Sequence, residues 1–212
     1  MRPLSLDHVA LWVAERDRIA AAADEALGLR VIERTERFTL LGEDARRGKL
    51  TLFDAEGPRT RGPLGRIGLR VRSLNGRPAA VDLGEGLELV LVEQPDGPEF
   101  DLDHVALLSE DPAAALRGWE RLGFAPAGES RVEVGGAHLE FHPGRPGQPE
   151  RPLLNHVGVL VESVEEHRAE AEELGVEIES LVDAPNTLAL FVWGPDRVKL
   201  EYIEHKPSFS LT

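Results

Sequence analysis

Three stretches of the sequence repeat one pattern: LDHVALWV at residues 6–13, LDHVALLS at residues 102–109 and LNHVGVLV at residues 154–161. Within each stretch the residues alternate as they do along a β-strand. A helical pattern follows each stretch and ends at Gly28, Gly123 or Gly175, which lie 20, 19 and 19 residues after the respective histidines. Because chance does not give this register three times, the chain is built from repeated strand–helix modules.

Each of these modules closes with a further strand-like run, namely KLTLF at residues 49–53, HLEFH at 138–142 and VKLEYIEH at 198–205. An additional module has RIGLRVRSL at residues 66–74 as its opening run and GLELVLVE at 86–93 as its closing run. The interval between these two runs is too short for a helix and two more strands. The sequence therefore predicts an α+β fold of four βαβββ-type modules, of which the second has lost its helix.

Two segments rich in proline and glycine interrupt the series, QPDGPEF at residues 94–100 and HPGRPGQPERP at residues 142–152. The second must be a loop, because proline removes a backbone donor from regular structure. We expect the first to separate two domains, a module pair at residues 1–96 and another at residues 100–212. Helices are expected to start at Asp111-Pro112 and at the capping box of Ser163 and Glu166.

The composition narrows the kinds of protein that this chain can be. Its 212 residues include no cysteine, which excludes disulfides, thiolate nucleophiles and cysteine-ligated metals. A formal charge of −14 argues against nucleic acid and anionic membranes as partners, since both are bound through lysine and arginine. Asp7 interrupts the N-terminal apolar run, so we expect neither a signal peptide nor a membrane span. We expect a cytoplasmic protein that binds a small-molecule substrate, with its oligomeric state, a homodimer included, left open.

Alternation along the strands places histidines and carboxylates on the open face of the last two modules. His104 and His156 occupy equivalent positions in their opening strands, and Glu140 and Glu201 occupy equivalent positions in their closing strands. A carboxylate in the middle of an apolar strand is costly to bury unless it is paired or binds a cation. These four residues therefore predict a site for Fe²⁺, Mn²⁺, Ni²⁺ or Zn²⁺ with open positions for a substrate.

The motifs DHV at residues 103–105, NHV at 155–157 and KLEY at 199–202 resemble those of the vicinal oxygen chelate superfamily. This superfamily contains glyoxalase I, extradiol dioxygenases, methylmalonyl-CoA epimerase and the bleomycin and fosfomycin resistance proteins. The resemblance implies that paired modules form U-shaped half-barrels around a metal. His104, His156 and Glu201 then match the three ligands of the extradiol enzymes, and Glu140 matches the fourth ligand of glyoxalase I.

The first two modules do not keep this set. Their corresponding residues are expected to be His8, Thr51, Arg66 and Glu88, and an arginine cannot lose its proton to bind a metal. Arg66 could instead pair with Glu88. We therefore expect a degenerate, metal-free half-barrel in the N-terminal half, an arrangement that resembles single-chain extradiol dioxygenases.

The resemblance implies a metal-dependent enzyme, and its order of modules favours an extradiol dioxygenase-like oxidoreductase with Fe²⁺ that chelates a substrate through adjacent oxygens. One alternative is a glyoxalase- or epimerase-like isomerase or lyase, in which Glu140 moves a proton and the neighbouring His138 assists as a catalytic residue. Another is a metal-free protein that sequesters a drug-like molecule. Phe191 stands where the dioxygenases have a tyrosine, which counts against the first interpretation.

Overall fold

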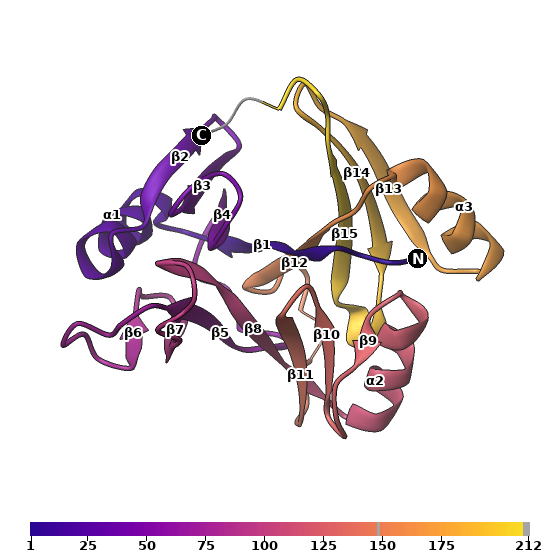
Figure 1. Ribbon diagram of the computed structural model, residues 1–212, viewed down its shortest axis with the longest axis horizontal. Helices are drawn as coiled ribbons and strands as arrows, with labels where there is room; N and C mark the ends of the chain where they lie inside the picture. The colour runs from indigo at the N-terminus through magenta and orange to yellow at the C-terminus, as the bar shows by residue number, and fades with distance from the viewer. Residues whose placement is uncertain (148, 210–212) are drawn as a thin grey trace.

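The computed structural model describes residues 1–147 and 149–209, and these form two β-sheets with three α-helices on their outer faces (Figure 1). The α+β fold predicted from the repeats is confirmed. The helices are α1 (Arg16–Leu27), α2 (Pro112–Arg121) and α3 (Val164–Glu173). A short 3₁₀ helix, η1 (Pro195–Arg197), precedes the last strand.

The larger sheet has eight strands, which come from the first and the fourth module. In spatial order they are β13 (Ile178–Asp183), β14 (Thr187–Trp193), β15 (Lys199–His205), β12 (Leu154–Leu160), β1 (Ser5–Val13), β4 (Lys49–Asp54), β3 (Phe38–Gly42) and β2 (Arg30–Arg34). The opening strands β1 and β12 pair antiparallel at the centre, and each runs parallel to the closing strand of its own module.

The second sheet has seven strands, which come from the second and the third module. In spatial order they are β6 (Ala80–Asp82), β7 (Glu88–Glu93), β5 (Leu64–Val71), β8 (Phe100–Ser109), β11 (Ala137–Pro143), β10 (Arg131–Val134) and β9 (Ala125–Pro126). The described chain has no helix between β5 and β7, so the predicted loss of the second module's helix is confirmed.

The modules do not pair in the way that the expected domains, residues 1–96 and 100–212, implied. The first module pairs with the fourth and the second with the third, so one half-barrel contains the first and the last module (Figure 1). The paired strands at both centres are opening strands of nearly the same sequence. Each opening strand therefore presents a similar edge for pairing, and its own sequence pattern does not determine which other opening strand it pairs with.

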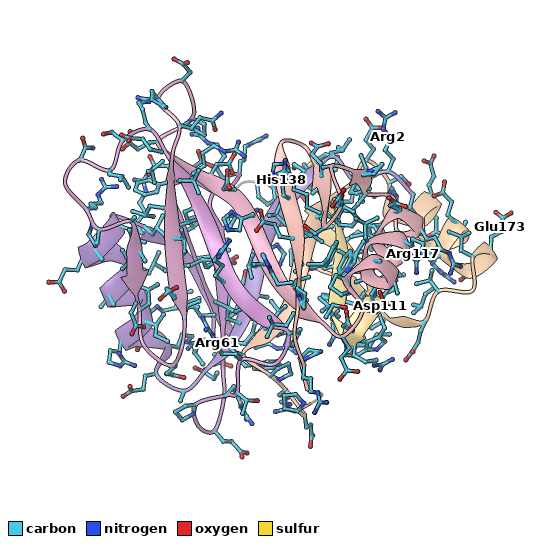
Figure 2. All side chains as sticks on the ribbon, turned by 90° about the horizontal axis from the view of Figure 1, so that it is seen from below. Arg2, Arg61, Asp111, Arg117, His138 and Glu173 are labelled. Atoms are coloured by element: carbon cyan, nitrogen blue, oxygen red, sulfur yellow. The ribbon has the colours of Figure 1, made fainter. Side chains whose placement is uncertain are left out.

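The helices start where the sequence predicts. The Asp111 carboxylate accepts a hydrogen bond from the Ala114 amide at 2.9 Å, and Pro112 is the first residue of α2 (Figure 2 labels Asp111). The Ser163 hydroxyl accepts from the Glu166 amide at 3.2 Å and caps α3. Each cap satisfies a free amide in the first turn and so fixes where its helix begins.

A single apolar core joins the two sheets. Val9 and Leu11 of β1 and Val105 and Leu107 of β8 are fully or almost fully buried in it, at 0–2% exposure. The Tyr202 hydroxyl of β15 donates to the Leu122 carbonyl after α2 at 2.8 Å, which ties the larger sheet to the third module. Among the described residues, no helix has both the length and the apolar character needed to cross a bilayer.

Candidate metal centre

Three residues that could bind a metal meet on the concave face of the larger sheet. His8 lies on β1, His156 on β12 and Glu201 on β15, which are neighbouring strands. The His8 Nε2 atom lies 2.9 Å from the His156 Nε2 atom, and both lie 2.9 Å from the Glu201 Oε2 atom. Only 4–7% of each residue's surface is exposed. The two imidazoles and the carboxylate thus direct one atom each at a common point.

The residue before each histidine fixes its imidazole. The Asp7 carboxylate accepts from His8 Nδ1 at 2.8 Å, and the Asn155 carbonyl oxygen accepts from His156 Nδ1 at 3.1 Å. The buried Lys49 ammonium donates to both oxygens of Asp7 at 2.8 Å. Because each Nδ1 carries the hydrogen that it donates, the neutral rings present an Nε2 lone pair to the site.

Three acceptor atoms in contact require a cation between or beside them. In the neutral tautomers, the two Nε2 atoms and the Glu201 carboxylate offer no hydrogen to one another. Ligand atoms about 2.1 Å from an ion and at right angles are about 3.0 Å apart, close to the separations found here. Two histidines and one carboxylate on one face of an octahedron are the ligand set of non-haem Fe²⁺ oxygenases. The donor set therefore fits a divalent metal with open positions for substrate.

Without a metal, the proton on His8 supplies the positive charge. Burial would lower the pKa of His8, but the Glu201 and Asp7 carboxylates raise it to about 9. Burial acts to raise the pKa of Glu201, yet the two imidazoles hold it well below its usual range. The pKa of His156 is lowered by burial first and by protonated His8 as well, against the opposing effect of Glu201. The metal-free centre is therefore an ionised Glu201, a protonated His8 and a neutral His156.

The site needs a glycine at one position. Residue 158 faces His8 across the β1–β12 pair, and a Cβ atom there would lie 2.3 Å from the His8 Cε1 atom. Sequence alternation places Gly158 on the open face with His156, and the structure shows that the His8 imidazole occupies the space above it. Ala10 takes the corresponding position opposite His156.

Aromatic rings form walls around the centre. The Phe191 ring lies 5.2 Å from the His156 ring and the Phe53 ring lies 6.2 Å from it, measured between centroids. Trp12 packs on Phe53 at 5.4 Å. A cavity of about 560 Å³ continues from Trp12 along the same face, beneath the loop that precedes β12. These rings cover one side of His156, and the neighbouring cavity has room for a small molecule.

Of the predicted ligands, His156 and Glu201 lie in this cluster, whereas His104 and Glu140 do not. The latter two lie on β8 and β11 of the other sheet, so they cannot join the former at one ion. The expectation of a metal-free N-terminal half is corrected too, since His8 of the first module completes the set. His8 carries the same DHV motif as His104, so a signal for it was present in the sequence.

The other predicted residues lie around these two sheets. His138, labelled in Figure 2, is partly exposed on β11 beside Glu140, in the half-barrel without the buried triad. Thr51 pairs with Ala10 just as Glu201 pairs with Gly158, so Thr51 takes the place of a fourth ligand. In the second module the same register places Val90 there, not Glu88 as expected.

Comparison with known proteins agrees with this architecture. Residues 101–202 match the model of the Glyoxalase/Bleomycin resistance protein/Dioxygenase superfamily. No curated protein matches the sequence. A solved structure described as a "putative dioxygenase" from Bacillus subtilis has 16% identity and a TM-score of 0.79, with 98% of this chain and 87% of that chain covered.

Two further solved structures have a similar fold. Glyoxalase I from Zea mays has 15% identity and a TM-score of 0.71, over 94% of this chain and 92% of that one. The cppA protein from Streptococcus pneumoniae has 17% identity and a TM-score of 0.61, over 95% of this chain and 98% of that one. At these identities the likeness establishes the fold of nearly the whole chain.

Proposed function

Because residues 101–202 belong to the Glyoxalase/Bleomycin resistance protein/Dioxygenase superfamily and the whole chain has the matching fold, we propose that this protein is a metal-dependent enzyme. Its ion, Fe²⁺ foremost, is held by His8, His156 and Glu201, and its chemistry is of the extradiol dioxygenase type. The observation that carries this proposal is the convergence of three buried acceptor atoms, each 2.9 Å from the others.

The absence of a second carboxylate as fourth ligand among these residues favours oxygenase chemistry over isomerase chemistry. A glyoxalase-like mechanism in this half-barrel would need a second glutamate to carry a proton, and the equivalent position holds Thr51. A hydroxyl neither binds a divalent ion as strongly as a carboxylate nor accepts a proton at neutral pH. Three protein ligands leave three positions of an octahedron open for substrate atoms.

The residues of this chain would bind the ion and orient the substrate, and the ion would act as the electrophile. When bound, a divalent ion chelates adjacent oxygens of a substrate and stabilises the charge that develops on them. Lys49 and Asp7 hold the His8 ring in place, and Asn155 does the same for His156. Phe191 and Phe53 shield the centre from water, which strengthens its electrostatic interactions.

A metal-free sequestering protein is the second candidate function, and one observation favours it. Protonated His8 and ionised Glu201 form a buried ion pair at 2.9 Å, so the centre is electrostatically complete without an ion. The proton would then be a permanent part of the fold. In that case chelators would have no effect on ligand binding.

The test combines metal analysis with oxygen uptake. Protein purified without chelators is analysed for metals, reconstituted anaerobically with Fe²⁺ and assayed with a panel of catechols. We expect about one ion per chain and catechol-dependent oxygen uptake that Glu201→Gln abolishes. Glu140→Gln makes the same chemical change in the other half-barrel and should leave both unchanged. Ligand binding that is insensitive to chelators, with no turnover with Fe²⁺ or Mn²⁺, would support the sequestering function instead.

A further inference from the structure

The smaller sheet contains the same constellation as the metal centre, with one residue changed. His104 faces Gly68 across the β5–β8 pair as His8 faces Gly158 across the β1–β12 pair. Glu140 pairs with Ala106, two residues after His104, just as Glu201 pairs with Gly158, two residues after His156. The remaining position, which a histidine occupies in the larger sheet, holds Arg66.

The His104 ring is prepared in the same way as the rings of the metal centre. The Asp103 carboxylate accepts from its Nδ1 atom at 2.8 Å, which leaves a lone pair on Nε2. A Cβ atom at Gly68 would lie 2.3 Å from the His104 Nδ1 atom, so this glycine makes the same room as Gly158 does for His8. One histidine ligand and the space for it are therefore retained.

The Arg66 side chain lies where the cation would be. Its Nε–H donates to His104 Nε2 at 3.2 Å, and a terminal nitrogen lies 3.4 Å from the Glu140 Oε2 atom. The guanidinium thus contacts the two atoms that would bind a metal and supplies the positive charge that they require. A guanidinium in a protein stays positively charged, so it remains a cation beside these two acceptors.

We propose that the smaller sheet is a metal site of the same kind that Arg66 has closed, with its guanidinium replacing both the ion and the third ligand. Each chain then holds one divalent ion, and the smaller half-barrel is complete without one. A single substitution, Arg66→His, should restore a second site with His104 and Glu140. Ala106 beneath residue 66 does not prevent this, because Ala10 lies in the same relation to His156.

The experiment counts ions. Wild-type protein and Arg66→His are equilibrated with Co²⁺, freed of excess and analysed for metal per chain, with circular dichroism as the check of folding. We expect Arg66→His to bind one ion more than wild type and Arg66→His/Glu140→Gln to return to the wild-type number. The measured quantity is the number of Co²⁺ ions per chain that Arg66→His binds in excess of wild type. It therefore tests the smaller sheet even if the larger sheet binds no metal.

A second variant protects the test against misfolding. Arg66→Ala removes the guanidinium and leaves two ligands, so it should gain a weaker Co²⁺ site that Glu140→Gln abolishes. Folded Arg66→His with the wild-type number of ions would overturn the proposal. If Arg66→His does not fold, a wild-type number in Arg66→Ala at millimolar Co²⁺ would do so.

The cavity beside the metal centre is a second, independent feature. Each strand that carries a ligand places another residue on the same face toward the cavity, namely Trp12 after His8, Leu154 before His156 and Lys199 before Glu201. Trp193, two residues beyond Phe191, forms the opposite wall. The cavity is therefore lined from the same strands as the metal centre, although the three clustered residues do not themselves line it.

Cations stack on both indole rings of this cavity. The Arg151 guanidinium lies 5.3 Å from the Trp12 ring centroid, and the Arg197 guanidinium lies 4.1 Å from that of Trp193. Arg197 is paired with Glu177 at 2.7 Å, whereas no carboxylate of the described residues lies within 4.0 Å of Arg151. Glu150 and Asp196 also line the cavity and would repel an anionic ligand. The anionic group of a ligand would therefore bind favourably only in direct contact with a guanidinium.

The backbone around the cavity is held in an uncommon conformation. Arg151, Asp196 and Arg197 all have positive φ, between 52° and 56°, and all three line the cavity. Residues other than glycine rarely adopt a positive φ, and those that do are often found at ligand-binding sites. The two cation-bearing turns are thus fixed on opposite sides of one space.

Resting on the proposed function, we infer that the substrate has a flat apolar body that packs in the cavity lined by Trp12 and Trp193 and a carboxylate that pairs with Arg151. The probes are 2-naphthoate and its neutral amide, titrated calorimetrically into metal-free protein with a chelator present. We expect Arg151→Gln to weaken 2-naphthoate binding about tenfold and to leave the amide unchanged. Arg145→Gln, an exposed change in the same loop, is the control.

Several results would overturn this inference. They are no binding of 2-naphthoate at millimolar concentration, equal effects of the two arginine variants, or equal effects of Arg151→Gln on the acid and the amide. Because the titration contains a chelator, failure of the metal centre cannot produce these results. Conversely, if the protein never binds metal but binds 2-naphthoate through Arg151, the proposed metalloenzyme is refuted and the inference about the cavity's ligand stands.

Discussion

Raising the pH should tighten metal binding, because the ion must displace a proton from His8. In the metal-free protein, Glu201 and Asp7 raise the pKa of His8 to about 9, against the opposing effect of burial. A metal requires the Nε2 lone pair, so binding and protonation at this atom exclude each other. Glu201 already has a lowered pKa and His156 has a lowered pKa, so neither holds a proton at neutral pH.

The size of the effect follows from that pKa. With a pKa of about 9, only about 1% of His8 is unprotonated at pH 7. The apparent affinity at pH 7 should then be about 100-fold below its high-pH limit, which corresponds to ~2.7 kcal/mol. Affinity should rise about tenfold per pH unit between pH 7 and 9 and level off above this range.

Calorimetric titration with Mn²⁺ at several pH values measures both the slope and the protons released. Two buffers of different ionisation enthalpy at pH 7 should report close to one proton released per ion bound. An affinity that is constant from pH 6.5 to 9, or binding at pH 7 without proton release, would show that His8 is not the protonated ligand.

The metal-free protein should show the opposite trend in stability. The pKa of His8 is raised on folding from 6.5 to about 9, so its charged form stabilises the fold fully below pH 6.5. This contribution is lost as the pH rises toward 9. Thermal unfolding with a chelator present should therefore show a falling midpoint from pH 7 to 9, and His8→Asn should lack this decline.

Three further substitutions test individual contacts. Glu201→Ala should lower metal affinity at least 100-fold by direct metal titration while the metal-free protein stays folded, because the side chain faces the concave surface rather than the core; unaltered affinity would remove Glu201 from the ligand set. Gly158→Ala should abolish metal binding by displacing His8, whereas Gly68→Ala, the matched change in the smaller sheet, should not; equal losses in both would refute the assignment. Lys49→Met should weaken metal binding 10–100-fold, measured in the same titration, because the carboxylate that orients His8 loses its partner.

Much of the fold could be predicted because its signals are local. Strand alternation, the Asp111 and Ser163 caps and the glycine at the end of α1 each depend on residues within one or two turns of each other. The missing second helix followed from the length of a single interval. The fourfold module repeat then determined which elements exist, although it did not determine how the modules pair.

The site was predicted in part, and its error came from the pairing. Pairing the third module with the fourth would have gathered His104, His156, Glu140 and Glu201, the richest ligand set in the sequence. The observed pairing gives a poorer set, two histidines and one glutamate, in a single sheet. Counting ligands therefore favoured the wrong partner, because a metal needs only three and every opening strand offers a similar edge.

Small residues on the opening strands limit which modules can pair but do not determine the pairing. Opposite each central histidine or arginine stands Gly158, Gly68, Ala10 or Ala106, and each observed sheet combines one glycine with one alanine. This rule excludes pairing the first module with the third and the second with the fourth. It permits both the expected arrangement and the observed one, so packing alone leaves two alternatives.

Charge pairing modestly favours the observed arrangement. In the expected arrangement, Arg66 would have faced His8 with Thr51 and Val90 at the carboxylate positions, which leaves a guanidinium without an acid. The Arg66 side chain is 44% exposed, so the lack of an acid would cost it little, and its contact with Glu140 contributes only modestly. In the observed arrangement Arg66 contacts Glu140, and each sheet has one carboxylate and one cation, whether guanidinium, proton or metal. Arg66, which cannot serve as a metal ligand, therefore contacts a carboxylate only when its module pairs with the third.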